Sequence, residues 1–194
     1  MKKWCLILLV AITFAFFGIS AGEANTLVDS PFPLQSPDQS WTLTVTDLGN
    51  GVDHGVVFFN NVSNTGIGVA LDSLGNPDNS ALGFSFIAAD LSNPSAPAWT
   101  STQEDTLLVA SPYPLQSPDT MQLFTAAQLN NFDHGVIFYN NAAGTAMAVV
   151  LDPNGVPDNF YLGYAFLAAD MKYNPIFMWG SRDGLGWFCI SGCN

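Results

Sequence analysis

The two histidines of this chain and their neighbours are the residues best suited to chemistry. His54 follows Asp53 in the segment DHGVVFFNN, and His134 follows Asp133 in the segment DHGVIFYNN; the sequence holds no other histidine. A carboxylate beside an imidazole raises the histidine pKa and can orient the ring as a base. Adjacent residues of an extended strand point to opposite faces, so such neighbours need not touch. The alternative interpretation is a turn before a strand.

Asparagines and aromatic rings close both segments. Phe59 and Tyr139 each precede a pair of asparagines. Amides bond hydroxyl groups and a ring stacks on a sugar face, so the pattern indicates a carbohydrate site, although asparagines also start turns. The predicted ligand-binding residues are Asp53, His54, Asn60, Asn61, Asp133, His134, Tyr139, Asn140 and Asn141.

Aspartates gather in two further segments, DSLGNPDN and DPNGVPDN, which we predict to be hairpin loops. Carboxylate and amide oxygens in a tight loop suit calcium, although the spacing is not that of an EF-hand and turn chemistry alone explains these residue types. The predicted metal ligands are Asp72, Asp78, Asn79, Asp152, Asp158 and Asn159. If a twofold axis brought the histidines together, two imidazoles would begin a copper or zinc site but not complete it.

An internal duplication organises the chain. Residues 53–90 align with residues 133–170 at an offset of 80 and are identical at 21 of 38 positions. SPFPLQSPD, at residues 30–38, recurs as SPYPLQSPD at residues 111–119. We therefore predict a first repeat over residues 29–99, a connector or extra strand over 100–109, a second repeat over 110–179 and an unrepeated tail over 180–194.

The pattern within each repeat predicts strands. WTLTVT alternates apolar residues with threonine, and VVFFNN and VIFYNN are rich in β-branched and aromatic residues. In the second repeat, DTMQLFTAAQLNN also fits a short helix, but a duplicated fold favours a strand there. A lone unit of four or five strands leaves one face uncovered. We therefore predict an all-β fold, an antiparallel β-sandwich or barrel with pseudo-twofold symmetry; two separate small β-domains are the alternative.

The first residues predict export. Lys2 and Lys3 precede an uncharged apolar stretch over residues 4–19, and small residues before Ala24 suit cleavage after it; cleavage after Ala21 or a retained anchor is the alternative. Export would leave Cys189 and Cys193, for which a small-loop disulfide is expected in an oxidising compartment. The predicted location is secreted or periplasmic, with no membrane span in the mature chain.

Charge and missing motifs narrow the function. The formal net charge is −12, with four lysines and arginines against sixteen carboxylates, so nucleic-acid binding is disfavoured. The sequence has no nucleophile elbow, zinc-protease motif, phosphate loop or dinucleotide fingerprint. The prediction is an exported protein that binds an extracellular ligand, carbohydrate first and a protein second, with calcium shaping the loops. The alternatives are a structural or interaction protein of an envelope or secreted assembly, and a hydrolase that uses the Asp-His pairs.

Overall fold

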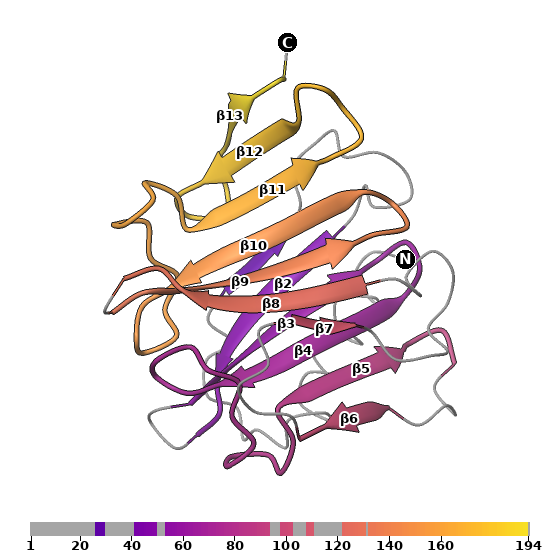
Figure 1. The fold of residues 1–194 in the computed structure, drawn as a ribbon, viewed down its shortest axis with the longest axis vertical. Helices are drawn as coiled ribbons and strands as arrows, with labels where there is room; N and C mark the ends of the chain where they lie inside the picture. Colours follow the sequence, from indigo (N-terminus) through magenta and orange to yellow (C-terminus); the bar gives the residue numbers. More distant parts are fainter. Residues whose placement is uncertain are drawn as a thin grey trace.

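Two antiparallel sheets make up the fold in a computed structural model that describes residues 26–29, 41–49, 53–93, 98–102, 108–110, 122–130 and 132–193 (Figure 1). The first sheet has six strands in chain order: β1 (Thr26–Asp29), β2 (Trp41–Asp47), β3 (His54–Asn60), β4 (Thr65–Leu71), β5 (Phe86–Asp90) and β6 (Trp99–Ser101). The second sheet has seven, also in chain order: β7 (Leu108–Ala110), β8 (Gln122–Gln128), β9 (His134–Asn140), β10 (Thr145–Leu151), β11 (Phe166–Asp170), β12 (Phe177–Ser181) and β13 (Trp187–Ser191).

The sheets repeat one another strand by strand. β1 to β6 correspond to β7 to β12, and the register is the same: Asp29 pairs with Thr42 as Ala110 pairs with Leu123. Among the described residues, β13 has no counterpart in the first sheet. No helix occurs in the part of the chain that the structure describes. The prediction of an all-β, internally duplicated antiparallel β-sandwich is confirmed.

Alternation along the central strands builds one core between the sheets. Val56 and Phe58 of β3 point inward, as do Val136 and Phe138 of β9, and all four are buried in one hydrophobic cluster. The two phenylalanine rings stack with centroids 5.1 Å apart and planes 13° apart. The same cluster takes in residues of β2, β4, β5, β8, β10, β11 and β12. Each sheet therefore covers the inner face that the other would leave exposed to water.

Several predicted boundaries can be compared with the strands. The segment of the second repeat that also fitted a helix is strand β8, as favoured. β6 and β7 reach into the predicted connector from its two ends, and the predicted tail contains the end of β12 and all of β13. The predicted signal segment and the two proline-rich segments, residues 30–38 and 111–119, lie outside the described residues. Among the residues described, no helix is long and apolar enough to cross a membrane.

Candidate functional site

The two histidines meet at the interface between the repeats. His54 begins β3 and His134 begins β9, and their Nε2 atoms lie 2.7 Å apart with ring centroids at 4.8 Å. Both side chains are buried, with relative exposures of 1% and 0%. One Nε2 must donate and the other accept, so the hydrogen bond requires one neutral imidazole to act as acceptor. The contact lies inside the sandwich and presents no ring to solvent.

Each histidine is covered by a hairpin loop of the opposite repeat. Gly75, between β4 and β5, lies against the ring of His134, and a Cβ at this glycine would overlap that ring. Gly155, between β10 and β11, lies in the same way against the ring of His54. Both glycines have positive φ, 79° and 73°. Only glycine meets both demands at low cost, so the loops and the histidines form a reciprocal clasp between the repeats.

The clasp opposes protonation. Burial, and after it repulsion from His54, lowers the pKa of His134 to about 4, although the carboxylates of Asp72 and Asp152 act in the opposite direction. The neutral form therefore predominates above pH 4. A buried neutral histidine of this kind packs the core.

The neighbouring aspartates accept hydrogen bonds from polar side chains of loops. Asp53 accepts a hydrogen bond from the Ser80 hydroxyl at 3.1 Å, and Asp133 accepts one from the Asn130 amide at 2.8 Å. Both carboxylates lie within loops that precede strands. These hydrogen bonds fit the turn interpretation.

Of the four predicted asparagines, the first of each pair is buried and starts a turn. Asn60 accepts backbone hydrogen bonds from Val62 and Ser63 through its side-chain oxygen, and Asn140 accepts one from Ala143. The second asparagines are more accessible: the Asn61 amide donates to Thr42, and Asn141 is exposed. The structure therefore does not bring the asparagines to one surface with the histidines.

The predicted metal ligands lie in the two hairpin loops. Asp72 and Asp152 each accept two backbone N–H bonds from their own loop, which closes it. Asp78 and Asp158 accept bonds from Ser80 and Phe160, and the amides of Asn79 and Asn159 reach backbone oxygens of Thr102 and Arg182. Among the described residues, no three His, Cys, Asp or Glu side chains form a group that could hold a metal. Calcium binding stays a prediction.

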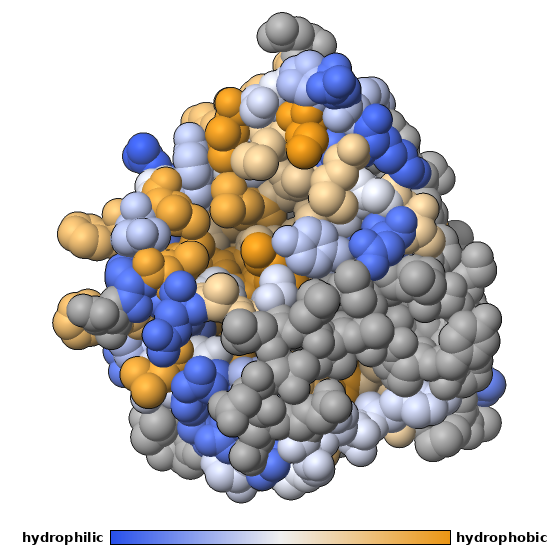
Figure 2. All heavy atoms as spheres, viewed as in Figure 1, coloured by the Kyte–Doolittle hydropathy of each residue, from blue (hydrophilic) through white to orange (hydrophobic). Residues whose placement is uncertain are grey.

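A groove on the outer face of the second sheet was not predicted. It measures about 230 Å³, and Figure 2 shows hydrophobic atoms gathered in a hollow on this face. Only Tyr139 among its residues belongs to the predicted site. The groove is lined by Ile137, Tyr139, Ala146, Met147, Ala148, Leu167, Ala168, Ala169, Met171, Ile176 and Met178.

On the equivalent face of the first sheet, outward side chains pack on one another. Val57, Phe59 and Ile87 form a buried cluster there, and Phe84 packs against it. The ring of Phe59 lies 3.2 Å from the position a Cβ would take on Gly66. In the second sheet that position is Ala146, so a ring cannot lie as closely over the strand.

One further exchange keeps the second groove open. Tyr164, the counterpart of Phe84, lies over Gly180 of β12, where a Cβ would come within 2.5 Å of the ring. The first repeat has Thr100 at the position of Gly180, and the threonine Cβ would prevent an aromatic ring from lying as close to the strand. The sequence differences at these two pairs of positions were the available signal for the groove. They could be interpreted only once the structure showed which residues face outward.

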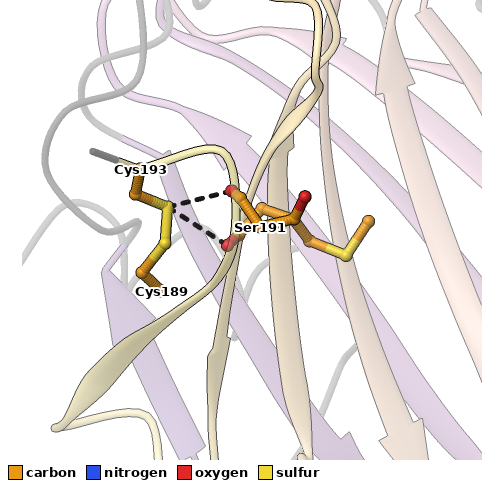
Figure 3. The surroundings of a disulfide bond; sticks show 4 residues. Cys189, Ser191 and Cys193 are labelled. Carbon is orange, nitrogen blue, oxygen red and sulfur yellow. Dashed lines mark hydrogen bonds between the residues drawn. A yellow bond between two sulfur atoms is a disulfide. The ribbon is translucent and has the colours of Figure 1, made fainter.

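The predicted disulfide joins Cys189 of β13 to Cys193, with Cα atoms 5.8 Å apart (Figure 3). The Cys193 sulfur also lies 3.4 Å from the Met178 carbonyl oxygen of β12. The bridge therefore ties the end of the chain to the edge of the second sheet.

Comparison with known proteins identifies no relative: no family model, curated protein or solved structure matches the chain.

Proposed function

We propose that the protein is an exported binding protein that holds an apolar ligand in the groove on the outer face of the second sheet. The observation that carries this proposal is the difference between the repeats. On this face the outward side chains of the first repeat form a buried cluster, whereas those of the second repeat line a groove. Export is supported by the predicted N-terminal signal and the disulfide.

The groove lining favours an apolar ligand. Its side chains are aliphatic, thioether or small, and Tyr139 supplies the only hydroxyl. A cavity of about 150 Å³ lined by apolar side chains accepts benzene, so the larger groove has room for a ring or part of an alkyl chain. Several large apolar side chains border this sheet and are exposed, among them Met171 and Ile176. Covering such surface is favourable by about 25 cal/mol per Å².

The test is binding of Nile red, an uncharged fluorescent probe, with displacement by decanol. Wild-type protein should bind both, and Ala148→Phe, which fills the groove floor, should weaken binding about tenfold or more through lost apolar contact. Phe160→Ser is the matched control, because Phe160 is 88% exposed and does not line the groove. Unchanged circular dichroism would establish that both variants fold. Full binding by Ala148→Phe, or no binding by wild type, would overturn the proposal.

Carbohydrate is the second candidate ligand, favoured by the Tyr139 ring in the groove and the exposed Asn141 two residues along the chain. A glycan array with and without calcium tests it. Glycan binding that disappears in Tyr139→Ala would favour a sugar over an apolar ligand. Loss in an Asp78→Ala, Asp158→Ala double variant would assign a role to the hairpin carboxylates.

A further inference from the structure

We infer that the ligand of the groove is an amphiphile with an anionic head, an alkyl carboxylate in the simplest case, and that Lys172 binds that head. This inference rests on the proposed function, because it assigns the chemical class of the ligand in the same groove. It is carried by the position of one lysine in a chain that has few bases.

Lys172 lies in the turn that borders the groove. The turn joins β11 to β12 and begins with Met171 and reaches Ile176, both of which line the groove. The lysine is therefore adjacent in sequence to a lining residue and within four residues of another. A charge at this rim would lie where a ligand's polar end leaves the apolar surface.

The stem of the lysine is held against the neighbouring turn. Its Cγ and Cε lie 3.0 and 3.3 Å from the position a Cβ would take on Gly144, at the turn between β9 and β10. Its backbone N–H donates to the Asp170 carboxylate at 3.1 Å, and Asp170 is buried. The side chain thus runs along the protein surface at one end of the groove, with less conformational freedom to lose on binding.

In the first repeat the equivalent outward side chains form a buried cluster, and the sequence has no lysine or arginine there. Asn64 stands at the position of Gly144, and Ser92 stands at the position of Lys172, where its hydroxyl donates to Asp90. Two independent differences therefore coincide on the same face: the apolar surface is open and a cation stands at its rim. With a net charge of −12, the chain as a whole repels anions, so a local cation is needed for an anionic ligand to be preferred.

Alkyl ligands of equal length and different heads test the inference. At pH 8 and low salt, wild-type protein should bind decanoate about threefold to fivefold more tightly than decanol, the gain expected from an exposed ion pair. The preference should shrink as salt screens the pair. In Lys172→Met the preference should vanish while decanol affinity stays the same. Arg182→Met, which removes the strong base at the turn between β12 and β13, is the matched control and should keep the preference.

The outcomes separate the two proposals. Equal binding of decanoate and decanol by wild type, or a preference that survives in Lys172→Met, overturns the anionic head and leaves the apolar groove intact. Tighter binding of decylammonium than of decanoate also overturns it, because the acidic chain would then dominate the rim. Failure of all three ligands to bind overturns the proposed function itself.

Discussion

At the contact between His54 and His134, two rings share one hydrogen bond in a setting that water does not reach. A proton added to such a pair must be accommodated without solvent and beside a second imidazole. That cost lowers the pKa of His134 from 6.5 to about 4. The consequence is a pH dependence of folding that surface histidines would not produce.

We predict that the free energy of unfolding falls by about 2 kcal/mol between pH 7.5 and pH 5 from His134 alone. The folded pKa lies below the unfolded value of 6.5, so the unfolded chain binds the proton first. Stability is therefore full above pH 6.5 and is lost as the pH falls toward 4. Urea unfolding at several pH values measures the effect.

The control for this pH dependence is the double variant His54→Leu, His134→Leu. Removing both rings leaves no imidazole unpaired, so the profile above pH 5 should be nearly flat. A profile as steep as that of the wild type would assign the pH dependence to other groups. The same double variant also tests the hydrolase alternative. Any hydrolase activity that depends on the Asp-His pairs should disappear in it.

The sequence identified the histidines as special but not the reason. Repetition of Asp-His-Gly could be read directly, and so could the alternation that puts Asp53 and His54 on opposite faces. That His54 lies against His134 depends on how the sheets are superposed, which is a long-range property of the packing. The asparagine turns followed from local chemistry and could be anticipated, whereas the groove could not.

At the scale of elements, the hairpin loops hold the repeats together through their glycines. Gly75 and Gly83 belong to the same loop and have nearly the same φ, 79° and 78°. A Cβ on Gly75 would overlap the ring of His134, whereas a Cβ on Gly83 would meet no atom within 4 Å. The loop therefore contains its own control for separating backbone strain from steric overlap.

We predict that Gly83→Ala costs about 1 kcal/mol of stability, the price of a left-handed backbone for alanine. Gly75→Ala should cost about 3 kcal/mol, because overpacking against the ring adds to the same strain. Thermal or urea unfolding of the two variants compares them directly. Equal losses would mean that the loop moves away from the histidine without penalty.

Strand identity and order were largely predictable from the sequence because alternation, turn residues and duplication all agreed. The strands at the sheet edges are the exceptions: β1 lies almost wholly before the predicted first repeat, and β13 lies in the segment interpreted as a tail. Its pairing with β12 arises because the second sheet has an open edge at that point. Nothing in a repeat comparison reveals a strand that occurs once.

Across the whole molecule, the repeats share one core rather than holding one each. The hydrophobic cluster contains residues of nine strands. Leu43 and Phe86 come from the first repeat, and Met147 and Trp179 come from the second. Neither sheet would retain a buried inner face without the other. Two separate domains could each unfold in a transition of their own, whereas the two sheets of this sandwich should unfold together.

We predict a single cooperative unfolding transition. Far-ultraviolet circular dichroism and tryptophan fluorescence should follow one curve in urea, because loss of either sheet exposes the core of the other. Two transitions, or midpoints that differ between probes, would show that the repeats unfold independently. The measurement should be made above pH 7, where the histidine pair is neutral.

The reciprocal packing also governs how the two halves can change over generations. Along β3 and β9 the inward residues are the same in both copies, at His54 and His134, at Val56 and Val136 and at Phe58 and Phe138. Two of the outward positions differ: Val57 corresponds to Ile137, and Phe59 corresponds to Tyr139. His54 and Phe58 each contact their own equivalents 80 positions away, so a mutation at either site changes a contact with its copy. Val57, Phe59 and Ile87 of the first repeat face outward in a cluster of that repeat alone, so the outer faces can diverge without disturbing the contact between the sheets.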